Sequence, residues 1–222
     1  MRVLYHVPLS PFSRKVRMAL KEKGLPFDLR LENVWERRVE FLKINPAGKV
    51  PVLVEADGTV IADSVAITEY LQEVQPQPDL LGGTPAQRAE TRRLVAWFDG
   101  KMHEEATVNL VGEKVMRRFL GRGEPDSATV RAGLANIRMH LDYVAFLVER
   151  RTWLAGDKFS LADIAAAAQF SCIDYIGDVP WGHQEAAREW YARVKSRPSF
   201  RPILDDRVPG LKPAGHYDDL DF

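Results

Sequence analysis

The segment Ser10-Pro11-Phe12-Ser13-Arg14-Lys15-Val16-Arg17 joins an apolar run, Val3-Leu4-Tyr5, to a helical pattern of apolar residues. Ser10 is a suitable N-cap, and Pro11 suits the first turn of a helix, where no backbone N–H is needed. A strand that leads into a helix N-terminus places free N–H groups and the positive end of the helix dipole at one corner. The segment therefore predicts a strand–turn–helix corner that favours an anionic ligand.

Serine stands at both positions that a C-x-x-C redox motif would give to cysteine, Ser10 and Ser13. Thiol–disulfide exchange needs a thiolate, so this corner cannot belong to a thiol oxidoreductase. The Ser10 hydroxyl could instead hold the thiolate of a ligand through a hydrogen bond. The alternative is that Ser10 serves only as the helix cap.

The composition describes a globular chain without a strong charge bias. Of its 222 residues 45% are hydrophobic, enough for two modest domains or one large one. Lys plus Arg and Asp plus Glu number 31 each, so the net charge is zero, which argues against nucleic acid as a partner. The single cysteine, Cys172, excludes an intrachain disulfide and lies in an apolar pattern typical of core packing.

The compartment follows from the same features. The start of the chain is too polar for a signal peptide and no apolar run is long enough for a bilayer, so we expect a cytoplasmic protein without direct membrane insertion. The histidines are scattered, and their spacing is not that of a metal site, so we expect no bound metal. They are His6, His103, His140, His183 and His216.

The first third of the chain alternates strand and helix signals. We expect strands at residues 2–7, 27–31, 52–54 and 59–62, and helices at residues 11–23, 34–42 and 65–74. Asp57-Gly58 is a strong hairpin signal between the last two strands, and Asp63-Ser64 can cap the last helix. Residues 1–75 are therefore predicted to form a small α/β domain on a mixed sheet.

Beyond a proline- and glycine-rich linker at residues 76–84, the long segments all read as helical. Residues 85–204 are predicted to form an all-α domain, with helices near residues 85–120, 130–148, 161–175 and 184–194. The third is nearly all apolar and begins with a capping-box pattern, Ser160 to Asp163, so we expect it to be the buried central helix. Residues 205–222 lose this periodicity and are predicted to form a C-terminal tail.

Four local motifs follow one another in the chain. They are Ser10-Pro11-Phe12-Ser13, Asn45-Pro46-Ala47-Gly48-Lys49-Val50-Pro51-Val52-Leu53, Asp63-Ser64, and Leu154-Ala155-Gly156-Asp157 before Ser160-Leu161-Ala162-Asp163. In this order, with the linker between them, the motifs resemble the cytosolic glutathione transferase superfamily over residues 1 to about 204. The resemblance implies a thioredoxin-like N-terminal domain and an all-α C-terminal domain, commonly paired as a homodimer.

The resemblance also implies a glutathione site. Val50-Pro51 would be a cis peptide that presents the backbone of Val50 to the cysteinyl part of glutathione, as a strand would. Asp63 and Ser64 would meet the γ-glutamyl group at a helix N-terminus. Ser10 would donate a hydrogen bond to the glutathione sulfur and lower its pKa. Each has a simpler alternative, because Pro51 can serve folding alone and Asp63-Ser64 can be only a helix cap.

The ending His216-Tyr217-Asp218-Asp219-Leu220-Asp221-Phe222 is unusual for a transferase. With Trp35-Glu36 and the Ser10 segment, it resembles a branch of the superfamily that works in bacterial cell division and binds FtsZ, the tubulin-like division polymer. This branch implies a non-enzymatic adaptor that is recruited to midcell, curves and bundles FtsZ filaments, and works beside other division proteins. The partner-binding residues predicted on this basis are Trp35, Arg117, Arg118, Arg122, Tyr217, Asp218, Leu220, Asp221 and Phe222.

Two functions from different classes thus remain open. The tail favours the FtsZ-binding adaptor, which needs no cofactor, whereas the Ser10, Val50-Pro51 and Asp63-Ser64 set favours a glutathione-dependent transferase or isomerase. Asp63 is one methylene shorter than the Glu or Gln that many members carry, and the bulky Phe12 sits beside the sulfur position. Both departures weigh against efficient catalysis. In either case we expect a two-fold homodimer.

Overall fold

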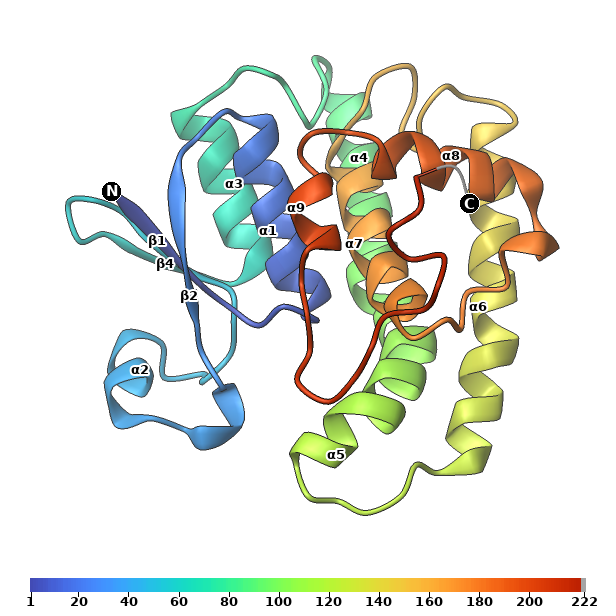
Figure 1. The fold of residues 1–222 in the computed structure, drawn as a ribbon. Helices are drawn as coiled ribbons and strands as arrows, with labels where there is room; N and C mark the ends of the chain where they lie inside the picture. The colour runs from blue at the N-terminus through green and yellow to red at the C-terminus, as the bar shows by residue number, and fades with distance from the viewer. Residues whose placement is uncertain (221–222) are drawn as a thin grey trace.

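The computed structural model describes residues 1–220 and divides into the two units that the sequence predicts (Figure 1). The N-terminal unit is a four-stranded mixed sheet in the order β2-β1-β3-β4, packed against helices. Its elements, in chain order, are β1 (Arg2–His6), α1 (Pro11–Glu22), β2 (Phe27–Leu31), η1 (Val34–Glu36), α2 (Val39–Ile44), β3 (Val52–Val54), β4 (Val60–Ala62) and α3 (Ser64–Val74).

Alternation along the strands assigns the two faces of this sheet. β1 runs parallel to β2 and antiparallel to β3, with Leu4 opposite Leu53 and Tyr5 opposite Val52. Leu4 and Leu53 join the main core with α1 and α3, whereas Tyr5 and Val52 pack with Phe41 of α2 on the other face. Because successive side chains in a strand point to opposite faces, a five-residue strand serves both cores. β2 is one edge of the sheet.

The single helix predicted at residues 34–42 is wrong in detail. Residues Val34–Glu36 form one 3-10 turn, and the α-helix begins only at Val39. Between them Arg37 adopts a left-handed φ of 47°, which a continuous α-helix cannot contain. This break places Trp35 on the outside of the N-terminal unit, toward the C-terminal domain.

The C-terminal unit consists of helices around one central helix. Its elements are α4 (Pro85–Ala96), η2 (Trp97–Met116), α5 (Arg117–Phe119), α6 (Ser127–Val148), α7 (Leu161–Tyr175), η3 (Trp181–His183), α8 (Glu185–Lys195) and α9 (Arg201–Leu204). The long helix predicted at residues 85–120 is confirmed, because α4 continues without a break into the π-helix η2 and then into α5.

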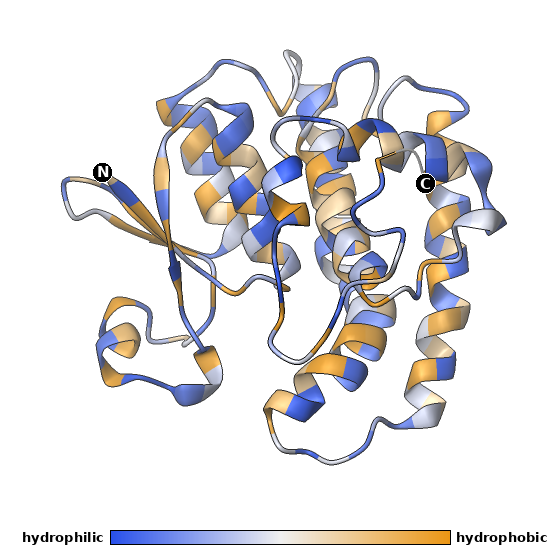
Figure 2. Ribbon diagram, viewed as in Figure 1, coloured by the Kyte–Doolittle hydropathy of each residue, from blue (hydrophilic) through white to orange (hydrophobic). Residues whose placement is uncertain are grey.

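All 15 residues of α7 are buried, which confirms the prediction of a central helix. Hydrophobic stretches are frequent along α7 and along the helices around it (Figure 2). The capping box is present. The Ser160 side chain accepts a hydrogen bond from a backbone N–H of the first turn, and the Asp163 side chain accepts one from the Ser160 N–H. Asp163 also accepts from the Leu154 N–H at 3.0 Å and from the Trp190 indole N–H at 2.9 Å. These donors satisfy a carboxyl whose burial raises its pKa. Cys172 is fully buried, as expected.

Charged side chains of α1 hold the two units together. Arg14 is fully buried and donates to the Pro8 carbonyl at 2.7 Å and to Ser171 Oγ of α7 at 2.9 Å. Arg17 donates to Asp206, just beyond α9, at 2.7 Å. Lys15 pairs with Asp99 of η2. A charged stripe that would normally face solvent is therefore a buried polar seam between the domains.

The C-terminal segment, residues 205–220, docks onto its own chain. Tyr217 is completely buried, its ring 5.1 Å from that of Tyr175 and its hydroxyl 3.3 Å from the Ile203 carbonyl. His216 bonds Asp174 at 2.8 Å, and the Ala214 N–H donates to the Tyr175 carbonyl at 2.9 Å. The interpretation of Tyr217 as an exposed partner anchor is wrong, because its aromatic ring completes the core of α7, α8 and α9.

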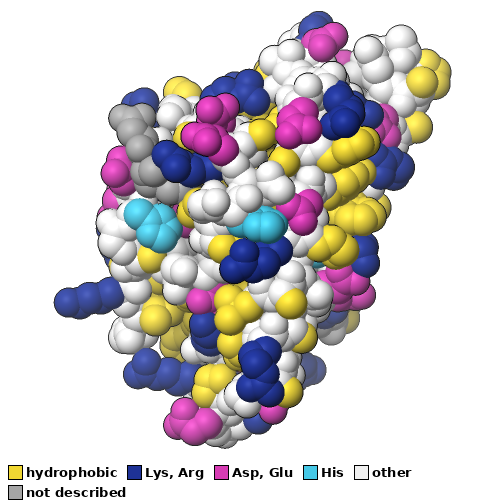
Figure 3. All heavy atoms as spheres, turned by 90° about the vertical axis from the view of Figure 1, so that its right-hand side faces the viewer, with side chains coloured by type: hydrophobic (Ala, Val, Ile, Leu, Met, Phe, Trp, Pro, Cys, Tyr) yellow, Lys and Arg dark blue, Asp and Glu magenta, His cyan; other side chains and the backbone are white. Residues whose placement is uncertain are grey.

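Over the α6 side of the molecule, Lys and Arg side chains alternate with Asp and Glu rather than forming one basic patch (Figure 3). Residues 1–220 contain no helix long and apolar enough to cross a membrane. Within that range no group of three or more His, Cys, Asp or Glu side chains is placed to hold a metal ion.

Candidate functional site

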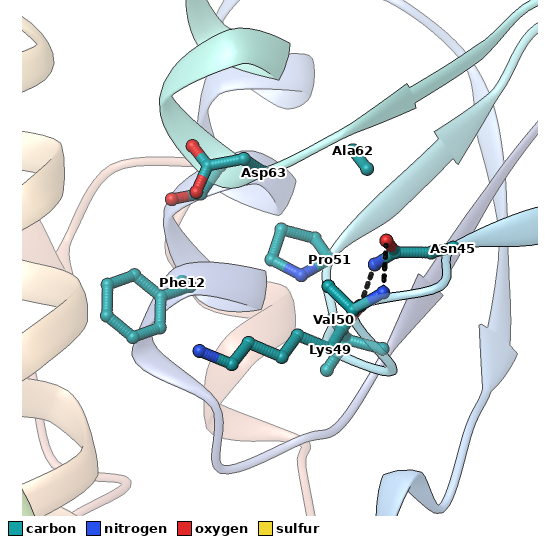
Figure 4. A pocket seen from close by; sticks show the side chains of 9 residues that line it. Phe12, Asn45, Lys49, Val50, Pro51, Ala62 and Asp63 are labelled. Carbon is teal, nitrogen blue, oxygen red and sulfur yellow. Dashed lines mark hydrogen bonds between the residues drawn. The ribbon is translucent and has the colours of Figure 1, made fainter. Parts of the chain in front are cut away.

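The first candidate site, here called the cis-proline pocket, lies in front of the cis Val50–Pro51 peptide. Asn45 holds the loop before this peptide, because its side-chain amide donates to the Lys49 carbonyl at 2.8 Å and its carbonyl accepts from the Ala47 N–H at 3.2 Å (Figure 4). The pocket has a volume of about 330 Å³. Its lining residues are Phe12, Asn45, Ala47, Lys49, Val50, Pro51, Ala62, Asp63 and Ser64.

Asp63 borders the pocket in a strained conformation, with φ 77° and ψ 135°. Non-glycine residues rarely adopt such angles, and they persist where the surroundings impose them, often at ligand sites. Its carboxylate accepts hydrogen bonds from the N–H groups of Val65 and Ala66, at 2.7 and 3.4 Å. The predicted cap is therefore confirmed, and one carboxylate oxygen is already committed inside the chain.

Ser10 is the N-cap of α1, its hydroxyl oxygen accepting from the Ser13 N–H at 3.2 Å. As an acceptor there, the hydroxyl keeps its own hydrogen for another partner. Ser10 lines a neighbouring apolar cavity of about 430 Å³ between the domains, here called the interdomain cavity. Phe12 borders both this cavity and the cis-proline pocket, whereas Ser10 lines only the former and Asp63 only the latter.

A polar cluster under the interdomain cavity was not predicted from the sequence. His103 packs edge-on against Phe12, with ring centroids 4.6 Å apart, and its Nδ1 lies 3.4 Å from Gln169 Oε1. Thr107 donates to the same oxygen at 2.7 Å. Burial lowers the pKa of His103. These residues come from η2 and α7, and nothing in their sequence spacing marks them as neighbours of Phe12.

The second candidate site, here called the Trp35 groove, lies where the two domains meet at the other end of the interdomain cavity. Trp35 stacks on Phe119, with ring centroids 5.4 Å apart and planes 18° apart. The groove has a volume of about 400 Å³ and is mostly apolar. Its lining residues are Val7, Pro8, Leu9, Leu31, Asn33, Trp35, Val115, Met116, Phe119, Arg207, Val208 and Pro209.

The Trp35 groove brings Trp35 beside the end of the long helix at Phe119 and beside the C-terminal loop at Val208 and Pro209. Arg118 donates to the Gly210 carbonyl at 3.3 Å, linking α5 to the loop that carries Val208 and Pro209. Arg117 pairs with Glu113 at 3.4 Å. Arg122 is exposed in the turn after α5, and its side chain pairs with no residue of the described chain.

The tail residues differ in their placement. Asp218 is exposed and pairs with Arg207 at 3.1 Å, beside the groove. Leu220 is partly buried against the main core. Asp221 and Phe222 lie outside the described residues. Of the predicted anchors, therefore, Trp35 lines the groove and Arg118 is bonded to the loop that forms one wall, whereas Tyr217 only supports the segment that carries this loop.

Sequence reasoning missed Phe119, Val208 and Pro209 as parts of this site. Phe119 lies within a basic run, and an aromatic residue at the end of a positively charged helix is the available signal. Val208-Pro209 was placed in the tail without a partner. Both contacts depend on how the domains pack, which no local pattern reveals.

Comparison with known proteins gives consistent results. Residues 4–79 match the profile of the glutathione S-transferase N-terminal domain, and residues 107–198 match that of the C-terminal domain. The chain is 53% identical to "FtsZ-localized protein A" of Caulobacter vibrioides, covering 100% of this chain and 98% of that protein. It is 31% identical to "Glutathione S-transferase 2" of Saccharomyces cerevisiae, covering 92% of this chain and 90% of that one.

Solved structures agree with this. A crystal structure described as a glutathione S-transferase from Rhodospirillum rubrum superposes with a TM-score of 0.99 at 56% identity, with full coverage of both chains. The structure of FzlA from C. crescentus superposes with a TM-score of 0.97 at 53% identity, covering 100% of this chain and 99% of that one. The two-domain fold, the cis-proline pocket and the two profile matches together place this chain in the glutathione S-transferase family.

Proposed function

We propose that this protein is a non-enzymatic adaptor of the transferase fold that binds FtsZ filaments and promotes their curvature and bundling during bacterial division. Two facts support the proposal. A relative that matches over the full length is named "FtsZ-localized protein A", and the FzlA structure superposes over the whole chain. The Trp35 groove supplies a surface of suitable chemistry. The adaptor acts in the cytoplasm and is recruited to midcell.

The single observation that carries the proposal is the stacked pair Trp35–Phe119 at the domain junction. Both rings are only partly buried, and the groove beside them is apolar. Two exposed arginines adjoin it, Arg207 in its lining and Arg118 on the Gly210 loop, and a third, Arg122, is exposed in the turn after α5. Aromatic residues and arginines are the side chains that most often dominate protein interfaces. An acidic surface that offers one apolar side chain fits this groove best.

The proposal includes a two-fold homodimer, as is common in the family. A dimer would grip two sites on one polymer and gain avidity. Arg92 and Arg93 of α4, which lie on the exposed face, already pair within the chain, with Glu69 and Glu90. Light scattering should give twice the 25.1 kDa chain mass at micromolar concentration. A mass of 25.1 kDa would reject the dimer.

The direct test is co-sedimentation with FtsZ polymerised by GTP, followed by electron microscopy of the pellets. The adaptor should pellet with the filaments, saturate, and produce arcs and bundles that FtsZ alone does not form. Unassembled FtsZ with GDP is the control for precipitation. Straight filaments and an adaptor that stays in the supernatant would reject the proposal.

A second candidate is a glutathione-dependent transferase or isomerase, and the cis-proline pocket favours it. Val50, Pro51 and Ser64 line one pocket, and the Ser10 hydroxyl keeps its hydrogen for a sulfur. Against it, one carboxylate oxygen of Asp63 already accepts hydrogen bonds from its own helix, and Ser10 lines the interdomain cavity rather than the cis-proline pocket. Titration calorimetry with glutathione tests this candidate. Saturable micromolar binding with turnover abolished by Ser10→Ala would establish it, and we expect neither.

A further inference from the structure

One edge of the sheet is a strand that has a neighbouring strand on one side only and carries exposed leucines. β2 is the end strand in the order β2-β1-β3-β4 and runs along the outside of the sheet (Figure 1). Leu29 and Leu31 are 44% and 56% exposed. An edge strand offers a row of free N–H and C=O groups, and proteins usually blunt such edges with charge, bulges or covering loops. The leucines make this edge a candidate for strand pairing.

The hydrogen-bond pattern shows which backbone groups of β2 point outward. The Glu32 N–H donates to the His6 carbonyl of β1 at 3.0 Å, so Glu32 faces the sheet. In a parallel pair, alternate residues bond to the neighbour strand, and the register places Leu29 opposite Leu4. Phe27, Leu29 and Leu31 therefore direct their backbone N–H and C=O groups away from β1.

The sequence of β2 is complementary to itself in reverse. The strand reads Phe27-Asp28-Leu29-Arg30-Leu31. When a second copy runs antiparallel with its Leu29 opposite the first Leu29, Asp28 lies opposite Arg30 and Phe27 lies opposite Leu31. Each pairing is thus apolar with apolar or acidic with basic, and both kinds stabilise an antiparallel sheet.

The register that matches the side chains also matches the backbone. The pairs Leu29–Leu29 and Phe27–Leu31 join residues whose N–H and C=O groups all point outward, so each would exchange both hydrogen bonds. Asp28–Arg30 then falls at the non-hydrogen-bonded positions, where the facing side chains are closest. A shift by one residue would lose this agreement, because it would oppose inward-facing groups to outward-facing ones.

The side chains are also available for this contact. Asp28 is exposed and its carboxylate pairs with no residue of the described chain. Arg30 donates to the Tyr5 hydroxyl at 3.0 Å, which positions it on the same face as Asp28 and leaves other guanidinium donors free. On the opposite face, a cavity of about 270 Å³ lies beside Phe27 and Leu29, where Leu31 of the second copy would lie.

We propose that two copies of this chain pair antiparallel through β2, centred on Leu29, and so join two four-stranded sheets into one. The contact is a second copy's strand, not a ligand site. With a separate two-fold dimer, two different two-fold contacts per chain build a closed tetramer or an open row. Because the strand is short, the pairing is weak in dilute solution and strengthens where copies gather.

Single cysteines test the register directly, because the native Cys172 is fully buried and does not react. Leu29→Cys in the full chain should form a covalent dimer on mild oxidation, since paired Cα atoms about 5.5 Å apart suit a disulfide. Leu31→Cys is the matched control. It is more exposed in the native chain, but its two copies would lie about 14 Å apart. Leu31→Cys mixed with Phe27→Cys should cross-link again.

Charge exchange tests the proposal without cysteine. Asp28→Arg and Arg30→Asp should each weaken the self-association measured by sedimentation equilibrium about tenfold, because two attractions become two repulsions. The double variant Asp28→Arg/Arg30→Asp should restore it. Circular dichroism melting checks that each variant is folded. Equal cross-linking of Leu29→Cys and Leu31→Cys, no covalent dimer from Leu29→Cys whose thiol is titratable, or no rescue by the double variant would overturn the proposal.

Discussion

The cis-proline pocket and the Trp35 groove lie at opposite ends of one interdomain cavity, yet they are built differently. The pocket uses short loops of the N-terminal domain and the starts of two helices, α1 and α3. The groove needs four segments: the β1–α1 loop, η1, the end of the long helix and the C-terminal segment. The pocket therefore depends on segments of one domain, whereas the groove depends on how the two domains and the C-terminal segment pack.

Their polar groups differ in the same sense. In the pocket, Asn45 bonds to its own loop, and Asp63 accepts hydrogen bonds from its own helix. At the groove, Arg122 is exposed, and Arg118 has four of its donors left after its bond to Gly210. The free hydrogen-bonding capacity of the two regions therefore lies mainly at the groove.

The largest expected effect comes from removing the support of the groove wall. Tyr217→Ala should lower the free energy of unfolding by about 3–5 kcal/mol, because a fully buried aromatic ring leaves a cavity. Urea denaturation measures the loss. Tyr217→Phe is the control and should cost about 1 kcal/mol, the hydrogen bond to Ile203. A wild-type value for Tyr217→Ala would show that the segment does not stabilise the core.

Trp35→Ala should have the next largest effect, on binding rather than on stability. Loss of an aromatic anchor costs about 2 kcal/mol, so the dissociation constant for FtsZ filaments should rise about thirtyfold. Trp153→Ala, which removes a tryptophan packed on Phe159 away from the groove, should leave filament binding unchanged. Co-sedimentation titrations compare the two. Equal losses would show that the groove has no special role.

Arg122→Asp should weaken filament binding about fivefold and reduce its salt dependence, because exposed interface charges act mainly on association. The melting temperature should not change, since the side chain has no partner within the described chain. Arg150→Asp, an exposed arginine on the far end of α6, is the control. A larger effect of Arg150→Asp would place the binding surface elsewhere.

The smallest effect concerns pH. The hydrogen bond to Asp174 raises the pKa of His216. The stabilisation of the fold by His216 is therefore complete below the ordinary pKa of 6.5 and is lost as the pH rises through the raised value. Because the side chain is 37% exposed, the loss should be below about 1 kcal/mol. Thermal melts from pH 6.5 to 9 should show a decline that His216→Asn removes.

Acidification lowers the stability through other groups, so its effect can be separated from that of His216. Burial lowers the pKa values of His6 and His140 to about 4, so both are neutral in the folded chain. Their contribution is complete above pH 6.5 and is lost as the pH falls from 6.5 to 4. If the stability declines below pH 6.5 but does not decline above it, the role given to His216 is contradicted.

Much of the fold could be predicted from local patterns. The bounds of α7 and its capping box, the Asp63 cap and the strands 27–31 and 52–54 follow from periodicity and end signals. The family resemblance added the cis peptide and the pocket. In these cases the residues that determine the structure are close in sequence.

What could not be predicted depends on contacts between distant segments. The burial of Arg14 and Lys15 depends on Ser171 and Asp99 of the other domain, which no local pattern brings to them. Tyr217 reads as an exposed anchor, because nothing local shows that Tyr175 and Ile203 leave a place for its ring. The stack of Trp35 on Phe119 has the same origin. Packing, not periodicity, determines these positions.

The central claim is that binding to the filament belongs to the Trp35 groove and not to the cis-proline pocket. Parallel co-sedimentation titrations of Trp35→Ala and Ser10→Ala with FtsZ filaments test it most directly. Ser10→Ala should lose about 1 kcal/mol of stability with its helix cap but bind filaments like the unaltered chain, while Trp35→Ala should bind about thirtyfold more weakly. Equal binding by Trp35→Ala and the unaltered chain, with a loss in Ser10→Ala, would contradict the account.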